Sequence, residues 1–386
     1  MAAPGIAPIS ISLESAKGSG TVATDTLLTA MLRCHEQVSD LIFSPGRLPQ
    51  VEIHGHLSAV QGPGLSTLTA DDTRRIASDL IGNNKQAIAT LREQGSCDVS
   101  FALAGVARFR VNVFIQRGSC AVVMRVIPTR IPDLASLALP AQLAEIATLR
   151  DGIVLVTGPR GSGKSSTLAA LLDLINQQRV CHVITIEDPI EFLHNHKRAT
   201  IHQRELHSDT PSMPLALRAA LRQAPDVILV SELRDQETAE MALEAAETGH
   251  LVLSSLNTVD VAQTWERVVA LFSSPHQPGV CSRLAKTARY IVSQRLLPRR
   301  DTHQRVPVVE ILKVRPGTME NPDTNELSTQ ALLQALKNGS SEGMQHFDGE
   351  IEKLVRANIV DLKTAMTYAT DPQQLRQNLL DFRLQN

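Results

Sequence analysis

A glycine-rich run in the middle of the chain matches the complete pattern G-x-x-x-x-G-K-S/T, and this match constrains the fold more than any other feature. The run reads Gly158-Pro159-Arg160-Gly161-Ser162-Gly163-Lys164-Ser165. An apolar, β-branched stretch leads into it over residues 153–157, and helical spacing begins at Ser166. A loop between such a strand and helix aims backbone N–H groups and the positive helix end at phosphate oxygens. We therefore expect residues 158–166 to bind a nucleoside triphosphate rather than to form a plain glycine-rich turn.

Specific side chains in and after this loop suit the chemistry of a bound nucleotide. Lys164 is placed to reach the terminal phosphates, and the hydroxyl of Ser165 is placed to ligate Mg²⁺. The apolar run Asp226–Ser231 predicts a strand, and Glu232 follows it directly. A carboxylate at this place in P-loop enzymes organises the metal or orients the attacking water. We expect Glu232 to be catalytic.

Glu187 and Asp188 form a second acidic site candidate, because they follow another strand-like run over residues 180–186. Adjacent carboxylates repel one another unless a cation neutralises them. We expect both to lie near Mg²⁺, and the alternative is an acidic turn before Pro189.

Three basic residues are further candidates for contacts with phosphates. His250 opens a predicted strand and is a candidate contact, or else a partner for the end of the preceding helix. Arg110 and Arg125 lie on neighbouring predicted strands of the first domain. Arginine offers a planar, bidentate fork for phosphate, although an arginine on a sheet face is often only solvated.

Composition limits the classes of partner. The chain has 386 residues, with 38 Lys and Arg against 40 Asp and Glu, and only 3% of its residues are aromatic. This length predicts two or three domains. The balanced charge and the scarcity of aromatic side chains argue against a nucleic acid partner.

Cysteine usage and hydropathy indicate the compartment. No C-x-x-C pair occurs among the five cysteines, which argues against a zinc ribbon and a disulfide framework and favours a reducing cytoplasm. The N-terminus lacks the pattern of a signal peptide, and no apolar run has the length of a membrane span. We expect a cytoplasmic protein that reaches a membrane only by docking on an embedded partner.

The order of patterns along the chain predicts its domains. We expect a disordered tail over residues 1–23, an α+β domain over 24–127, a proline-bracketed linker over 128–133 and an α/β domain over 134–386. In the last part, strands alternate with helices, which predicts a mostly parallel sheet covered by helices. The expected strands there are residues 152–157, 180–186, 226–231, 251–255 and 290–294. A final helical segment is expected over residues 344–382, and Asp25 is expected to cap a helix near the start.

Four blocks in this order resemble the PilT-type retraction motors of type IV pili, within the secretion-ATPase superfamily. They are the P-loop, the Asp box over residues 183–191, the Walker B strand over 226–235 and the His box over 249–253. Residues 108–114 and 343–348 are also similar to the family. The resemblance covers almost all of the chain after the tail.

The resemblance implies a PAS-like first domain, a RecA-like ATPase domain and a cytosolic homohexamer that docks on the inner-membrane pilus platform protein. It implies ATP and Mg²⁺ between the domains, with Arg110 and Arg125 matching phosphate-contacting arginines. Glu232 matches the catalytic Walker B glutamate, and Glu187 matches the acid of the Asp box. The implied role is ATP-driven domain rotation that removes pilins during retraction and twitching. The absence of a tetracysteine zinc module favours the retraction branch over the assembly branch.

The chain also departs from the family pattern. Asn257 replaces the second histidine of the His box, Ser231 replaces a glycine of Walker B and Arg160 replaces a threonine of the P-loop. The family's A-I-R-x-L-I-R-E helix is not recognisable over residues 314–320. These departures keep open an alternative function, an accessory pilus-motor subunit that binds nucleotide and hydrolyses it weakly. A small-molecule kinase is disfavoured, because the first domain and the Asp box have no role in one.

Overall fold

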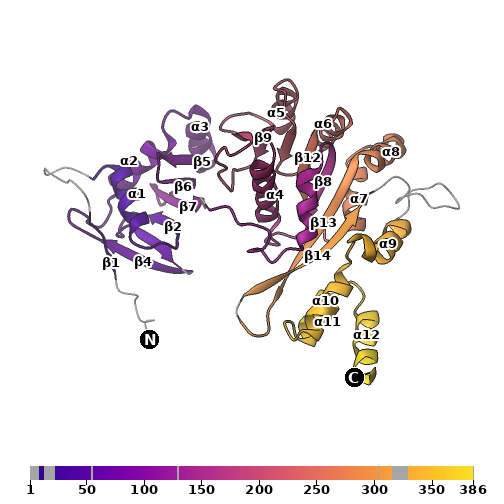
Figure 1. The fold of residues 1–386 in the computed structure, drawn as a ribbon. Coiled ribbons are helices and arrows are strands. Elements are labelled where there is room, and N and C mark those ends of the chain that lie inside the picture. Colours follow the sequence, from indigo (N-terminus) through magenta and orange to yellow (C-terminus); the bar gives the residue numbers. More distant parts are fainter. Residues whose placement is uncertain are drawn as a thin grey trace. The chain divides into compact units, whose positions relative to one another are not determined.

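The computed structural model describes residues 8–12, 22–53, 55–127, 130–302, 304–314 and 329–385. It divides into two compact units between Thr129 and Arg130, and Glu191–Leu193 is assigned to the first unit. Figure 1 follows the chain from the first unit in indigo to the C-terminal helices in yellow. Two expected features, Pro128 of the linker and residues 315–320, lie outside the described residues.

The first unit is built on a seven-stranded sheet with the order β1-β4-β3-β2-β7-β6-β5. The pairs are antiparallel, except that β1 runs parallel to β4. The strands are β1 (Ile9–Ser10), β2 (Val38–Phe43), β3 (Gln50–Ile53), β4 (His56–Gln61), β5 (Ser96–Leu103), β6 (Ala107–Gln116) and β7 (Ser119–Ile127). The meander of β5, β6 and β7 follows the alternating runs of the sequence, because period-2 patterns place one set of side chains in the core.

Three helices belong to the first unit, α1 (Thr24–Arg33), α2 (Ala70–Ile81) and α3 (Lys85–Gln94). Thr69 and Asp72 form a capping box at the start of α2, which satisfies two backbone donors reciprocally.

Two expectations for the first unit are wrong. Asp25 lies in the first turn of α1 and does not cap it, and Ile9–Ser10 form a strand within the segment expected to be a disordered tail.

The second unit contains another seven-stranded sheet, with the order β10-β9-β11-β12-β8-β13-β14. All neighbours are parallel except β13 and β14, which form a long antiparallel pair. The strands are β8 (Gly152–Thr157), β9 (His182–Glu187), β10 (Thr200–Glu205), β11 (Val227–Val230), β12 (Leu251–Leu256), β13 (Ala288–Pro298) and β14 (Arg305–Lys313). This is the expected α/β architecture, with β10 and β14 added at its edges.

Helices cover both faces of this sheet, as a parallel sheet requires. On one face η1 (Ala141–Thr148) and α4 (Lys164–Gln178) pack on Val154 and Val156. The other face, with Ile153 and Leu155, is covered by α5 (Met213–Ala220), α6 (Gln236–Glu247), α7 (Val261–Ala270), α8 (Gln277–Thr287) and α9 (Thr329–Asn338). A short turn, η2 (Ser274–His276), precedes α8.

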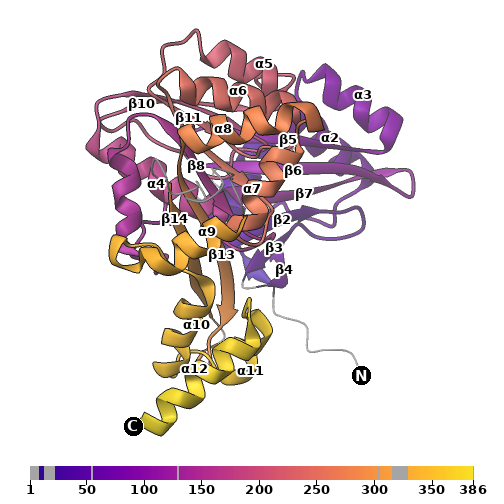
Figure 2. The same cartoon turned by 90° about the vertical axis from the view of Figure 1, so that its right-hand side faces the viewer.

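The helical segment expected over residues 344–382 consists of several helices, which form a bundle at the end of the chain. After η3 (Gly339–Glu342) come α10 (Phe347–Arg356), α11 (Leu362–Tyr368) and α12 (Pro372–Gln385). Figure 2 shows these helices gathered at one end of the β13–β14 pair. Their core includes Phe347 and Ile351 of α10 together with Leu297 of β13 and Val308 of β14. The bundle is therefore fixed to β13, which is a neighbour of the P-loop strand β8, and to β14 at the sheet edge.

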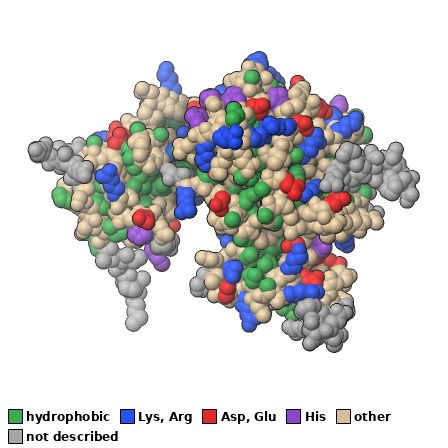
Figure 3. Space-filling model, viewed as in Figure 1, with side chains coloured by type: hydrophobic (Ala, Val, Ile, Leu, Met, Phe, Trp, Pro, Cys, Tyr) green, Lys and Arg blue, Asp and Glu red, His purple; other side chains and the backbone are tan. Residues whose placement is uncertain are grey.

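The surface mixes charges of both signs, as the balanced composition suggests. Figure 3 shows acidic and basic side chains interspersed over the face in view. Among the described residues, none of the helices combines the length and the hydropathy needed to cross a membrane.

Candidate nucleotide-binding site

The glycine-rich loop joins a buried strand to a helix, as its sequence predicts. Every residue of β8 is buried, and α4 begins at Lys164 directly after the loop. Gly163 is left-handed, with φ of 91°, and no side chain caps the start of α4. The first N–H groups of a helix have no partner within the helix, and they carry a partial positive charge. The start of α4 therefore suits an anion.

Gly158 is a position where only glycine fits. Its φ is 147°, and an added Cβ would lie 2.4 Å from the carbonyl oxygen of Gln294 and 2.5 Å from Oγ of Ser162. Gly161 also has a positive φ, of 75°. The loop is thus folded tightly against β13, and its backbone has the conformation that glycine allows and other residues resist.

Lys164 reaches back across the loop. Its Nζ donates to the carbonyl oxygens of Gly158 at 2.8 Å and Pro159 at 3.1 Å. The ammonium group is therefore held at the loop, next to the start of α4. Ser165 and Ser166 follow as the second and third residues of that helix. The local geometry of a cation, a helix start and small hydroxyl side chains fits a polyphosphate.

Glu232 and Asp188 are brought together by an arginine that the sequence analysis did not select. Arg234 donates from Nε to Oε2 of Glu232 and from Nη1 to Oδ2 of Asp188, each at 2.8 Å. These bonds raise the pKa of Arg234, with that to Glu232 the largest cause. Both carboxylates follow parallel strands, β11 and β9, so they meet at the carboxyl edge of the sheet, where β8 also ends.

Glu187, the last residue of β9, has its own polar partners. Oε1 of Glu187 accepts hydrogen bonds from Oγ1 of Thr185 at 2.7 Å and from Nε2 of Gln203 at 3.0 Å. The structure thus places Glu187 at the same edge as Asp188 and Glu232, and neutral donors hold it there.

Asn257, which departs from the family pattern in the sequence, contacts a candidate catalytic residue at this edge. It directly follows β12, the strand between β11 and β8. Its Nδ2 donates to Oε1 of Glu232 at 2.5 Å. Glu232 is therefore held from two sides, by the amide of Asn257 and the guanidinium of Arg234. The substitution in the His box was a signal in the sequence, but the contact with Glu232 was not predictable from it.

His250 does not join this group, and the expected contact of His250 with the phosphates needs correction. It precedes β12, and its carbonyl oxygen accepts from the N–H of Gly152 at 3.0 Å. Gly152 begins β8, so His250 lies at the amino edge of the sheet, opposite to the P-loop. Its Nδ1 lies 2.9 Å from the carbonyl oxygen of Ala245 in α6. This is the helix-end role that the sequence left as the alternative.

Arg110 and Arg125 lie directly opposite one another on β6 and β7 of the first unit. Arg125 donates from Nε to Oδ1 of Asp40 at 3.0 Å, and Nε of Arg110 is 4.0 Å from Oδ1 of Asp98. Paired like charges are unfavourable unless acidic partners offset them, and each arginine has one. The side chains of Arg110 and Arg125 are 54% and 73% exposed, so both can accept a further anionic partner.

The donor set at the carboxyl edge suits Mg²⁺ held mainly by a substrate. Among the described residues, no cluster of three or more His, Cys, Asp or Glu side chains could hold a metal by itself. Mg²⁺ keeps several waters and is usually bound through one or two carboxylates together with substrate phosphates. Ser165, Glu187 and Asp188 therefore fit as partial ligands or as partners of its waters.

Comparison with known proteins extends these observations to the whole chain. A family model for type II/IV secretion system proteins matches residues 53–384. A twitching motility protein of Neisseria gonorrhoeae is 38% identical over 327 residues, covering 85% of this chain and 86% of that protein. The type IV pilus retraction ATPase PilT of Pseudomonas aeruginosa is 38% identical over 335 residues, covering 87% and 95%. A crystal structure of the pilus retraction motor PilT with bound ADP aligns with a TM-score of 0.78 at 39% identity, covering 88% of this chain and 95% of that one.

Proposed function

Because the chain belongs to the family of type II/IV secretion system proteins, we propose that it is an ATPase motor that powers the retraction of type IV pili. The proposal is supported by relatives named for retraction and twitching motility, which align with most of this chain. The similar structure with bound ADP supports nucleotide binding by the P-loop unit.

The observation that carries the proposal is that the P-loop and the carboxylate of Glu232 lie at the same edge of the sheet, and that two side chains hold this carboxylate by hydrogen bonds. Lys164 and the start of α4 bind the phosphates. Ser165 would help to hold Mg²⁺, which would neutralise charge that develops on the phosphates. Glu232 then orients the water that attacks the terminal phosphate, with Asn257 and Arg234 fixing its carboxylate. Glu187 and Asp188, at the end of the neighbouring strand β9, would help to hold Mg²⁺. Hydrolysis requires this arrangement, whereas nucleotide binding alone does not.

The mechanical part of the proposal concerns assembly and coupling. A homohexameric ring in the cytoplasm docks on the inner-membrane platform protein of the pilus, and Arg110 and Arg125 contact the phosphates as the first unit rotates. The 54% and 73% exposure of these side chains supports such a contact. A ligand shifts a conformational equilibrium only by its different affinity for the two states. Hydrolysis therefore drives motion by removing the contacts that favour the closed state.

One observation supports the alternative function, an accessory pilus-motor subunit. Asn257 stands where the retraction motors have a histidine, and it contacts Glu232 directly. An accessory pilus-motor subunit with weak hydrolysis would tolerate such a change. The turnover of the purified full-length chain separates the two functions, because an accessory subunit needs a second ATPase for activity.

The cellular test uses a piliated bacterium that lacks its own retraction ATPase. Expression of this chain should restore twitching motility, and the Lys164→Ala variant expressed at the same level should not. If the unmodified chain is expressed and hydrolyses ATP without restoring motility, the retraction role is wrong while the ATPase activity stands.

A further inference from the structure

A chain of hydroxyl groups in the second unit joins the start of the P-loop to the segment that carries Asn257. We propose that Thr264 of α7, which lies outside the four sequence blocks, is a positioning residue for hydrolysis. It holds Asn257, and through Asn257 the carboxylate of Glu232, in a fixed place relative to the P-loop. This inference rests on the proposed ATPase function and adds to it a residue that acts from the core.

The hydroxyl chain starts at Thr157, the last residue of β8, which directly precedes Gly158 of the P-loop. Thr157 is paired with Ser293 of β13 on one side and with Leu256 of β12 on the other. Oγ1 of Thr157 lies 2.7 Å from Oγ of Ser293, and both side chains are fully buried. The hydroxyl of Thr157 is therefore fixed to the sheet immediately before the P-loop begins.

Thr264 continues the chain from Thr157 to the segment after β12. Its Oγ1 lies 3.2 Å from Oγ1 of Thr157 and 2.7 Å from Oγ1 of Thr258, and it donates to the carbonyl oxygen of Asp260 at 2.6 Å. A hydroxyl has one proton and two acceptor lone pairs, so Thr264 can bond with all three neighbours at once. Thr264 is fully buried, where an unpaired hydroxyl is costly, so these bonds favour a single arrangement of the four residues.

The far end of the chain lies next to the group that holds the candidate catalytic carboxylate. Thr258 directly follows Asn257, whose amide donates to Oε1 of Glu232. A displacement of Thr258 would therefore carry the amide of Asn257 away from Glu232. The hydroxyl of Thr264 fixes this segment and so sets the place of the carboxylate.

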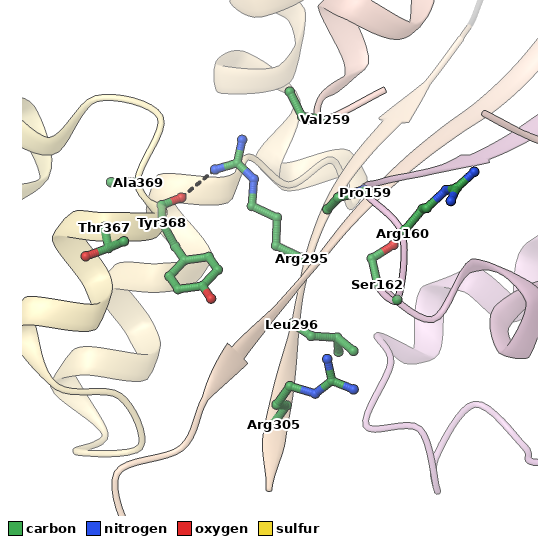
Figure 4. Close-up of a pocket in the computed structure, with 11 residues that line it drawn as sticks. Pro159, Arg160, Ser162, Val259, Arg295, Leu296, Arg305, Thr367, Tyr368 and Ala369 are labelled. Atoms are coloured by element: carbon green, nitrogen blue, oxygen red, sulfur yellow. Dashed lines mark hydrogen bonds between the residues drawn. The ribbon is translucent and has the colours of Figure 1, made fainter. Parts of the chain in front are cut away.

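The same segment lies beside the P-loop on the outer side of the sheet edge. Figure 4 shows Val259, the residue after Thr258, and Pro159 of the P-loop lining one cavity. The two segments are thus neighbours at the surface and are linked through hydroxyls in the core. A movement of one relative to the other has to break bonds made by Thr264.

The start of α7 has anchors that do not involve the hydroxyl of Thr264. The side chain of Asp260 accepts from the N–H of Gln263 at 2.8 Å and caps the helix. The carboxylate of Glu310 on β14 accepts from the N–H of Val261 at 2.9 Å. The helix therefore forms without the hydroxyl of Thr264, and a variant that lacks this hydroxyl should fold.

Steady-state ATP turnover of the purified full-length chain tests the role. Thr264→Val keeps the branched Cβ and removes the hydroxyl. We expect kcat to fall by about 3- to 100-fold, the range for a small displacement of a catalytic group, while the KM for ATP changes little. Thr264→Ser keeps the hydroxyl and should recover most of the turnover. Thr287→Val is the matched control, because Thr287 is also buried, donates to the carbonyl oxygen of Arg283 four residues earlier, and lies at the end of α8.

The double variant Asn257→Ala/Thr264→Val separates positioning from a general effect on the fold. If Thr264 acts through Asn257, the second substitution adds little to the loss that Asn257→Ala causes alone, since residues that act as a unit are not additive. Independent effects would multiply.

Hydrogen exchange of the nucleotide-free chain tests the link without hydrolysis. The amides at the start of α7, residues 261–264, should exchange about 2- to 10-fold faster in Thr264→Val, the range for loss of one hydrogen bond, and unchanged in Thr287→Val.

Unchanged turnover in Thr264→Val, multiplied losses in the double variant, or unchanged exchange would overturn the inference. Failure of the proposed function gives a different result, because the unmodified chain then has no turnover while the exchange rates still respond to Thr264→Val.

Discussion

Asn257 holds Glu232 by a hydrogen bond of 2.5 Å from its Nδ2 to Oε1 of the carboxylate, so the residue after β12 fixes the residue expected to orient water. Asn257→Ala removes one of the two side chains that hold Glu232 and leaves the hydrogen bond from Arg234. A small displacement of a catalytic group costs up to about 100-fold in rate, so we expect turnover to fall by about 3- to 100-fold.

The KM for ATP should change little in Asn257→Ala, because Asn257 acts through Glu232. Asn257→His restores a ring donor at this place and should recover most of the turnover. Steady-state kinetics of the three proteins would check this. Full activity in Asn257→Ala would show that Glu232 needs no second partner.

Lys164→Ala tests the phosphate site. The side chain reaches the loop carbonyls of Gly158 and Pro159, so its ammonium is held at the loop where we propose that phosphates bind. Losing a charge-assisted contact should weaken Mg·ATP by about 1.5–3 kcal/mol. Isothermal titration calorimetry measures the affinity for Mg·ATP. An unchanged affinity in the variant would show that the phosphates do not bind at this loop.

Arg125→Ala tests the coupling between nucleotide and the first unit. We expect turnover to fall, because the proposed contact of Arg125 with the phosphates, which would favour the closed state, is lost. The substitution also leaves Asp40 without its partner, and the Asp40 side chain is only 8% exposed, so stability should fall by about 1–3 kcal/mol.

The double variant Asp40→Asn/Arg125→Ala separates the two effects. It removes the buried charge and should restore most of the stability, measured by urea unfolding, while turnover stays low. If turnover recovers together with stability, Arg125 serves the fold and does not contact the nucleotide.

Buried Glu310 predicts a pH dependence of stability in the second unit. Burial raises the pKa of this carboxyl from 4.5 to about 7, although the N–H of Val261 donates to it at 2.9 Å. The folded chain therefore binds a proton that the unfolded chain has released between these two pH values. Stability from this group is fully present below pH 4.5 and is lost as pH rises through 7.

Glu310→Gln should remove this loss of stability at high pH, because the amide of glutamine resembles the protonated acid and does not titrate. The free energy of unfolding of the variant, relative to the unmodified chain, should rise by about 1–3 kcal/mol between pH 5 and pH 8. Burial also lowers the pKa of His194 to about 4, so this residue contributes to the pH dependence of stability. Its contribution is the same in both proteins and cancels when they are compared at each pH. Urea unfolding at the two pH values checks it, and a difference that stays constant would mean that Glu310 titrates normally.

Much of the second unit was predictable because its constraints are local. The P-loop needs glycine at left-handed positions and a lysine at the helix start, and these requirements are written in consecutive residues. The strands β8, β11 and β12 were also predicted, since strands buried on both faces read as apolar, β-branched runs.

What was missed depends on contacts between distant residues. Strand β10 lies at the sheet edge, and its alternation of exposed and buried residues includes His202 and Gln203, so it has no continuous apolar run. The partners of Glu232 come from Arg234 and Asn257, which only the packing of β11 beside β12 brings together. The sequence did place His250 at the start of its strand, but the start of a parallel strand lies at the sheet edge opposite to the P-loop, so the expected phosphate contact did not fit that position.

The most direct test of the account is ATP turnover by the purified full-length chain beside its Glu232→Gln variant. The amide keeps the shape and the hydrogen bond from Arg234 but lacks the charge that orients water. We predict that the variant binds Mg·ATP as tightly as the unmodified chain, while its turnover falls by about 10²- to 10⁴-fold. Equal turnover in the two proteins would contradict the account, because hydrolysis would then not depend on the carboxylate held by Asn257 and Arg234.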